Sequence, residues 1–177
     1  MTAAFNHFLV GRPGVGKTTL LLKVAQRLKA LRVGGFFTRE IREAGGRLGF
    51  GVETFSGLSG TLAHVSRQQG SHVGKYRVDV ETFERIGVAG LENAVQEAQV
   101  ILLDEIGKME LCSGRFRKAV VSALDSDKPV LATVMAHLDP FVDALKARAD
   151  VQVVEVTADN REHLAEELSA QLMSEIQ

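Results

Sequence analysis

Several features that would indicate a compartment or a partner are scarce in this sequence. A single cysteine, Cys112, excludes an internal disulfide within these 177 residues and fits a reducing compartment. No apolar run reaches the roughly 18 residues that span a bilayer, and the first residues lack the basic region of a secretory signal. Lysine and arginine (21) nearly balance aspartate and glutamate (22), so no basic field attracts nucleic acid or anionic lipid. We therefore expect a cytoplasmic protein with no nucleic-acid partner and no membrane contact.

Tryptophan is absent and only three prolines interrupt the chain, whereas glycine is abundant with 17 residues. Hydrophobic residues make up 45% and charged residues 24% of the sequence, which is typical of a globular protein with a full core. We find no internal repeat and no linker-like segment. These features predict one domain over residues 1–177 and a monomer, with an oligomer left open.

Short apolar runs alternate with stretches of helical periodicity. The first run, 5–10, precedes an amphipathic stretch that predicts a helix over about 17–31. The later apolar runs, each followed by a segment that can form a helix, are 100–104, 129–134 and 151–156. This alternation predicts the α/β class: a three-layer α/β/α fold of the phosphate-loop type, with a mostly parallel sheet.

Residues 36–54 depart from this alternation. Two strand-like runs flank Gly45 and Gly46, and the second run alternates apolar and polar residues. We expect an antiparallel hairpin added to the parallel sheet. The next stretch, 56–74, is polar, rich in glycine and weakly periodic, and we expect it to form a long loop with a short helix.

Two helix starts have recognisable caps. Asp139 can cap a helix that has Pro140 in its first turn, where the missing amide proton costs nothing. Asp159 and Glu162 have the spacing of a capping box before the last helix. The apolar stripe of that last helix is Leu164, Leu168 and Leu172.

Directly after the first predicted strand, residues 11–18 read GRPGVGKT and fit the phosphate-loop pattern GxxxxGKT. Glycines let the backbone turn tightly and aim successive amides at phosphate oxygens, at the positive end of the following helix. Lys17 would reach the β- and γ-phosphates, and the Thr18 hydroxyl would bind magnesium. The residues expected at the nucleotide are Gly11, Arg12, Pro13, Gly14, Val15, Gly16, Lys17, Thr18 and Thr19.

A second pair of candidates ends the buried run 100–104. In open α/β sheets the ligand lies outside the carboxyl ends of the strands, so Asp104 and Glu105 should face the same crevice as the loop. Asp104 would hold magnesium, and Glu105 would orient and deprotonate the attacking water. The same residues with Gly107 also fit the DxxG form of switch GTPases. However, the chain contains no Asn-Lys-x-Asp stretch to read guanine, which favours broad base tolerance.

Longer segments resemble a known family. They include GRPGVGKTTL, GFFTREIREAGGRLGFGVETFSG, VGKYRVDVETFE, DEIGKMEL, PFVDALKARADV and VTADNREHL, from residue 11 to about 165. The chain resembles the small nucleoside-triphosphatases of archaea and bacteria, whose vertebrate member is the cancer-related nucleoside-triphosphatase. The resemblance implies slow, magnesium-dependent hydrolysis of ATP, GTP, CTP and UTP to diphosphate and phosphate. It also implies nucleotide contacts along Gly11–Thr18 and around Asp104–Glu110, including Lys108.

Several other side chains could serve the same reaction. Asn160 and Arg161, at the start of the last helix, could border the base. Thr133 could sense the γ-phosphate, and Tyr76 could either stack on a base or cover the core. The candidates for an internal arginine finger are Arg39, Arg148 and Arg161, although a surface ion pair is the more common role for any one of them.

The sequence predicts a magnesium-dependent nucleoside-triphosphatase with nucleoside triphosphates as substrates. A kinase that passes the γ-phosphate to a nucleotide or nucleoside is an alternative, although no arginine-rich lid is evident between 104 and 150. A nucleotide-sensing module, in which slow hydrolysis resets a conformation, is a further alternative.

Overall fold

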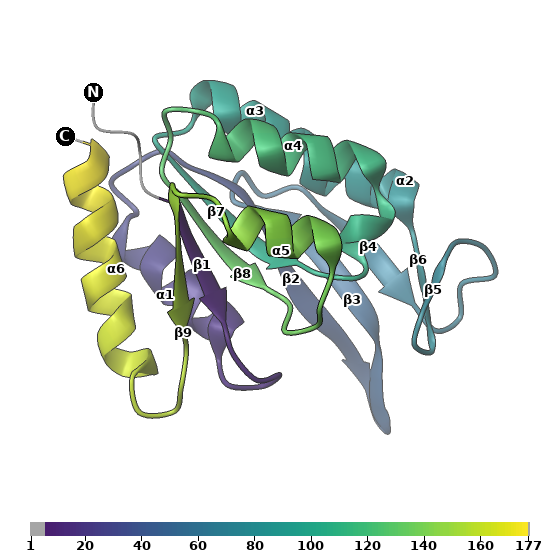
Figure 1. Cartoon of the computed structure of the whole chain (residues 1–177). Helices are drawn as coiled ribbons and strands as arrows, with labels where there is room; N and C mark the ends of the chain where they lie inside the picture. The colour runs from purple at the N-terminus through teal and green to yellow at the C-terminus, as the bar shows by residue number, and fades with distance from the viewer. Residues whose placement is uncertain (1–5, 177) are drawn as a thin grey trace.

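The computed structural model describes residues 6–176, and a nine-stranded mixed sheet runs through it in the order β5-β6-β4-β3-β2-β7-β8-β1-β9 (Figure 1). The strands are β1 (Asn6–Val10), β2 (Val33–Glu43), β3 (Gly46–Thr54), β4 (Ser59–His64), β5 (His72–Val73), β6 (Tyr76–Val78), β7 (Val100–Ile106), β8 (Val130–Val134) and β9 (Val151–Glu155). The helices are α1 (Lys17–Arg27), α2 (Val80–Phe83), the π-helical turn η1 (Glu84–Val88), α3 (Ala89–Glu97), the 3-10 turn η2 (Glu110–Cys112), α4 (Gly114–Leu124), α5 (Pro140–Lys146) and α6 (Arg161–Ile176).

The sheet has a parallel part and an antiparallel part that share strand β2. Strands β7, β8, β1 and β9 are parallel, and residues 33–36 of β2 pair with β7 in the same direction. From Phe36 onward β2 pairs with β3 as an antiparallel hairpin, and β4, β6 and β5 extend the sheet beyond it. The predicted hairpin is therefore confirmed, with a tight turn in which Gly45 and Gly46 both have positive φ.

Helices cover both faces of the sheet, which confirms the predicted three-layer α/β/α fold. Helices α1 and α6 pack on one face, whereas the remaining helices pack on the other (Figure 1). Consecutive strand residues point to opposite faces, so a strand buried on both sides needs a continuous apolar run. Neighbours that divide between the two cores are Phe8 and Leu9, Leu103 and Leu102, and Ala132 and Leu131.

The apolar runs 100–104, 129–134 and 151–156 form parallel strands whose ends differ from the prediction by a residue or two. The run 5–10 forms β1 from Asn6 onward, and residue 5 lies outside the described residues. The helix expected over about 17–31 ends earlier, at Arg27, with Leu28 as its fully buried cap residue. Within residues 6–176, no helix is long and apolar enough to cross a membrane.

The expectation for residues 56–74 is wrong, because they form strands β4 and β5 and no helix. Leu62 and Ala63 are buried, and β4 pairs with β3 on one side and β6 on the other. Gly60 lies so close to helix α2 that a β-carbon there would be 2.7 Å from the Thr82 side chain. The local sequence pattern does not predict β4, because its glycine and polar residues have low strand propensity. The stability of the strand comes from pairing and packing with distant segments instead.

The cap expected before α5 is confirmed, because Asp139 accepts hydrogen bonds from the amides of Phe141 and Val142 at 2.9 and 3.2 Å. The capping box expected before α6, between Asp159 and Glu162, is wrong, because the pair forms two residues earlier. The reciprocal pair is Thr157 and Asn160, whose side-chain oxygens each accept the other residue's amide at 3.2 and 2.7 Å.

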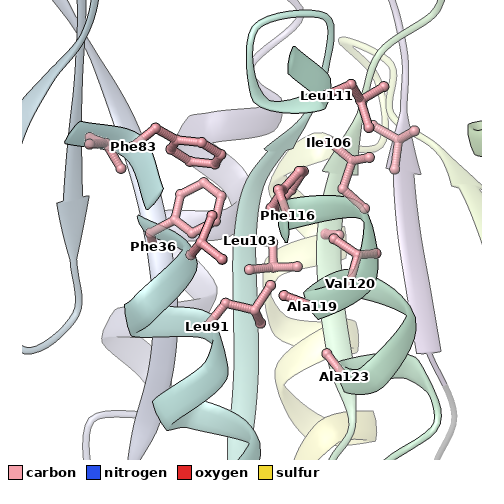
Figure 2. Packing of buried hydrophobic residues seen from close by; sticks show 14 of the residues in the cluster. Phe36, Phe83, Leu91, Leu103, Ile106, Leu111, Phe116, Ala119, Val120 and Ala123 are labelled. Atoms are coloured by element: carbon pink, nitrogen blue, oxygen red, sulfur yellow. The ribbon is translucent and has the colours of Figure 1, made fainter. Parts of the chain in front are cut away.

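Three phenylalanines from distant segments form the centre of the core on the α3 and α4 side (Figure 2). The ring centroids of Phe83 and Phe116 are 5.2 Å apart, and Phe36 lies 5.4 Å from Phe83 and 5.9 Å from Phe116, all edge to face. Because Phe36 lies on β2 and packs on α4, this cluster links the hairpin strand to the helix that follows β7.

Phe116→Ala should lower the free energy of unfolding by about 3–5 kcal/mol, since it removes a fully buried ring and leaves a cavity. Urea unfolding followed by circular dichroism measures this change. Leu138→Ala is the control, because Leu138 is 92% exposed and its loss should change stability by less than about 0.5 kcal/mol. Equal stability of the two variants would contradict the role of the aromatic cluster.

Candidate nucleotide site

The glycine-rich loop leaves strand β1 and leads directly into helix α1. Gly14 and Gly16 have φ of 80° and 106°, in the left-handed region that non-glycine residues seldom adopt. Gly16 is the cap residue of α1, so the free amides of the first helical turn face the loop. Lys17 folds back over this loop, and its Nζ donates a hydrogen bond to the Gly11 carbonyl at 3.0 Å. The loop thus has both free amides and a nearby ammonium group.

The Asp104 carboxylate joins this loop to the end of β7. The Thr18 hydroxyl on α1 lies 3.0 and 3.1 Å from the two carboxylate oxygens, although the two residues are 86 positions apart. Thr133, at the end of β8, donates to Asp104 Oδ1 at 2.7 Å. Thr38 donates to Oδ2 from its hydroxyl at 3.1 Å and from its amide at 3.3 Å. Asp104 is buried, and these donors satisfy a carboxylate that would otherwise be costly to bury.

Glu105 is next to Asp104, close to a second carboxyl group. A β-carbon built on Gly107 would lie 2.5 Å from Glu105 Oε1 and 3.0 Å from Glu110 Oε2, so both side chains converge on that glycine. Burial raises the pKa of Glu105 above its usual value, the charge of Asp104 raises it further, and Lys17 opposes the shift. Burial, and then the charge of Glu105, also raise the pKa of Glu110 well above its usual value.

Thr38 is not among the residues expected from the sequence, and Glu110 is expected only as the end of the range Asp104–Glu110 for which the resemblance implies nucleotide contacts. Thr38 is an ordinary strand threonine by pattern, and only its place beside β7 brings it to Asp104. Glu110 lies within the segment DEIGKMEL that carries the family resemblance, so that segment was the available signal for it. Its burial on the turn η2 could not be seen from the residue type.

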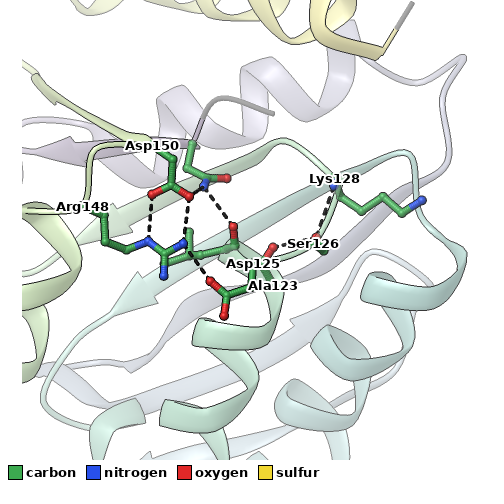
Figure 3. A network of polar contacts seen from close by, with 8 residues as sticks. Ala123, Asp125, Ser126, Lys128, Arg148 and Asp150 are labelled. Carbon is green, nitrogen blue, oxygen red and sulfur yellow. Dashed lines mark hydrogen bonds and ion pairs between the residues drawn. The ribbon is translucent and has the colours of Figure 1, made fainter. Parts of the chain in front are cut away.

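The three arginine-finger candidates lie in different places. Arg161 is at the loop, where its Nη1 donates to the Val15 carbonyl at 3.0 Å. Arg39 follows Thr38 on β2 and pairs with Glu53 at 3.0 Å. Arg148 precedes β9, at the opposite edge of the sheet from the loop, and binds Asp125 and Asp150 (Figure 3). These ion pairs connect the end of α4 to the start of β9, which gives Arg148 a structural role.

The other candidate residues, Asn160, Lys108 and Tyr76, also lie in different parts of the structure. Asn160 has its side chain engaged in the turn before α6, where its Nδ2 also donates to the Glu155 carbonyl at 2.8 Å. Lys108 is exposed on the segment that follows β7. Tyr76 is buried, packs on Phe50 with centroids 5.3 Å apart, and accepts a hydrogen bond from Arg47. Of the two readings of Tyr76, the structure therefore supports the core.

The chain is similar to known proteins over nearly its whole length. A family model described as NTPase matches residues 6–169, nearly the whole chain. The chain belongs to the NTPase family. The nucleoside-triphosphatase THEP1 of Thermotoga sp. (strain RQ2) is 46% identical over 160 residues, which cover 90% of this chain and 91% of that relative. The cancer-related nucleoside-triphosphatase of Homo sapiens is 39% identical over 176 residues, which cover 91% of this chain and 93% of that protein.

Solved structures in this NTPase family share the fold. The crystal structure of THEP1 from the hyperthermophile Aquifex aeolicus superimposes with a TM-score of 0.86 at 34% identity, covering 94% of this chain and 98% of that chain. The solution structure of the human cancer-related enzyme gives 0.83 at 39% identity, covering 97% and 98%. The protein is a nucleoside-triphosphatase, a hydrolase, which confirms the predicted enzyme class.

The donor chemistry at the candidate site fits magnesium. Among residues 6–176, no group of three or more histidine, cysteine, aspartate or glutamate side chains could hold a metal ion. Magnesium in phosphate-transfer sites needs no such cage, because it takes one or two protein oxygens together with phosphate oxygens and waters. The Thr18 hydroxyl and the Asp104 carboxylate provide two such oxygens 3.0 Å apart at the mouth of the loop.

Proposed function

We propose that this nucleoside-triphosphatase hydrolyses ATP, GTP, CTP and UTP to the diphosphate and phosphate in a magnesium-dependent reaction with low base selectivity. The observation that carries the proposal is the contact between the Thr18 hydroxyl and the Asp104 carboxylate. It joins the amide-rich loop, where phosphates would bind, to the acidic end of β7.

The loop residues would bind the triphosphate. The amides of Gly11–Thr19 and the positive end of helix α1 would surround the phosphate oxygens. Lys17 now donates to the Gly11 carbonyl, and its flexible stem allows the ammonium to exchange that partner for a phosphate oxygen. Neutralising charge on the leaving group in this way lowers the barrier to cleavage.

Thr18 and Asp104 would hold the metal ion. When bound, the ion would supply positive charge that offsets the negative charge of the phosphates. The Thr18 hydroxyl can go on donating its hydrogen bond to Asp104 while a lone pair of the same oxygen faces the ion. Asp104 would act through a water, since its carboxylate is buried and already accepts three other hydrogen bonds.

Glu105 would take the proton of the attacking water. Its pKa is raised by burial and by the neighbouring Asp104 charge, which makes its ionised form a stronger base. It directly follows the proposed metal ligand, so a water it orients would lie close to the phosphates.

Low base selectivity is supported by the side chains beside the loop. The Asn160 side chain is held in its own turn, where Oδ1 accepts from the Thr157 amide and Nδ2 donates to the Glu155 carbonyl. Arg161 is a flat cation over the loop, and such a group can stack on any base without reading its edge. The cytoplasmic location and the monomeric state expected from the sequence remain predictions.

Phosphate release measured with ATP, GTP, CTP and UTP tests the substrate range and the metal requirement together. All four should be cleaved with kcat/KM values within about tenfold of one another, a spread of about 1.4 kcal/mol. Removing magnesium with EDTA should abolish release, as should Lys17→Ala, and magnesium should restore the wild-type rate. Cleavage of GTP alone, or full activity in EDTA, would overturn the proposal.

Glu105→Gln should lower kcat by about 10²–10⁴-fold, because the amide cannot accept the water proton. Nucleotide affinity should be retained, since the amide keeps the size of the side chain. Single-turnover hydrolysis and the binding of a fluorescent ATP analogue measure the two effects. Near-normal hydrolysis would assign the base to another residue.

Gly107→Ala tests the position of Glu105 without changing its chemistry. The added methyl would lie 2.5 Å from Glu105 Oε1, and the flexible carboxylate would have to move away. We expect kcat to fall about 10- to 100-fold with KM little changed. Gly114→Ala is the matched control, because a β-carbon there has no neighbour within 4 Å. Equal kcat in the two variants would count against a base held at this point.

A further inference from the structure

Strand β2 changes partners next to Thr38. Residues 33–36 pair in parallel with β7, and the last pair of that ladder joins Phe36 to Leu103. Beyond it, β2 continues as the first arm of the hairpin, with Thr38 opposite Val52 of β3. Thr38 therefore lies where the hairpin separates from the strand that carries Asp104.

At this junction the Asp104 side chain takes the place of a backbone acceptor. The Thr38 amide donates to Asp104 Oδ2 at 3.3 Å, and the Thr38 hydroxyl donates to the same oxygen at 3.1 Å. Two donors from one residue fix the position of that oxygen and, with it, the rotation of the Asp104 carboxylate. The residues are 66 positions apart, so the contact exists only because β2 and β7 are neighbours in the sheet.

The other donors leave a specific task to Thr38. Thr133 binds only Oδ1, whereas the Thr18 hydroxyl lies almost equally far from both oxygens and is itself a proposed metal ligand. Thr38 is thus the donor that binds Oδ2 without also being a proposed ligand of the ion. Without the Thr38 hydroxyl, Oδ2 would keep only the longer contact with the Thr38 amide, at 3.3 Å, and the contact with the Thr18 hydroxyl, which also lies near Oδ1.

We propose that Thr38 is a positioning residue for the magnesium site, and that it ties the β2–β3 hairpin to that site. The inference rests on the proposed function, in which Asp104 holds the ion through a water. Residues that orient metal-binding carboxylates from behind commonly change metal affinity by about 10- to 100-fold when they are replaced.

The test uses the full chain with ADP and Mn²⁺, and electron paramagnetic resonance measures free Mn²⁺. Thr38→Val removes the hydroxyl but keeps the β-branched shape and the amide, so the Mn²⁺ dissociation constant should rise about tenfold. Thr38→Ser restores a hydroxyl and should return it to within about threefold of wild type. The matched control is Thr61→Val, an exposed threonine on β4, which should bind Mn²⁺ like wild type.

Hydrolysis assays on the same variants separate a role at the ion from a general loss of structure. Thr38→Val should need about tenfold more Mg²⁺ for half-maximal rate, while its KM for ATP at saturating Mg²⁺ stays unchanged. If the valine variant does not fold, as judged by thermal unfolding, Thr38→Ala replaces it with the same expectation.

The outcomes distinguish the two proposals. Wild-type protein that binds no Mn²⁺ with ADP, or that hydrolyses ATP fully in EDTA, would overturn the proposed function and this inference with it. A wild type that needs the metal, together with a Thr38→Val variant whose Mn²⁺ affinity is normal, would overturn the role of Thr38 alone. Failure of Thr38→Ser to restore Mn²⁺ affinity would also contradict the hydroxyl's role.

Discussion

The buried carboxylate of Asp104 connects the parts of the molecule that carry the proposed chemistry. It accepts hydrogen bonds from helix α1, from strand β8 and from strand β2, through Thr18, Thr133 and Thr38. A buried carboxylate without such donors would be strongly unfavourable, so its burial and its partners depend on each other. Any shift of α1, β8 or β2 relative to β7 would therefore change the geometry of the proposed metal site.

The order of the strands explains how these contacts arise. Strand β8 lies between β1 and β7, so Thr133 at its end lies beside the acidic residues of β7. All three strands are parallel and end at the same edge of the sheet, which is where α/β proteins bind ligands. On the α3 and α4 side, the cluster of Phe36, Phe83 and Phe116 packs β2 against α4 and so supports the position of Thr38.

Much of the fold could be predicted from the sequence, because the signals were local. Continuous apolar runs predicted the parallel strands, and paired glycines between strand-like runs predicted the hairpin. The local pattern does not predict strand β4, since Gly60 and its polar neighbours have weak strand propensity and the strand depends on pairing with β3 on one side and β6 on the other. The sequence predicts the cap before α6 two residues late, because Thr157 and Asp159 are both good cap residues and only the backbone path selects one of them.

The sequence by itself determined the kinds of groups in the site: a loop of glycine, lysine and threonine, and two adjacent acids after an apolar strand. Residue type and spacing along the chain carry that information directly. Only the tertiary structure decided which other side chains meet Asp104, because Thr133 and Thr38 lie 29 and 66 positions away and reach it through the order of the strands. It also decided that Glu105 and Glu110 converge on Gly107, since burial and the path of η2 set the direction of both carboxylates.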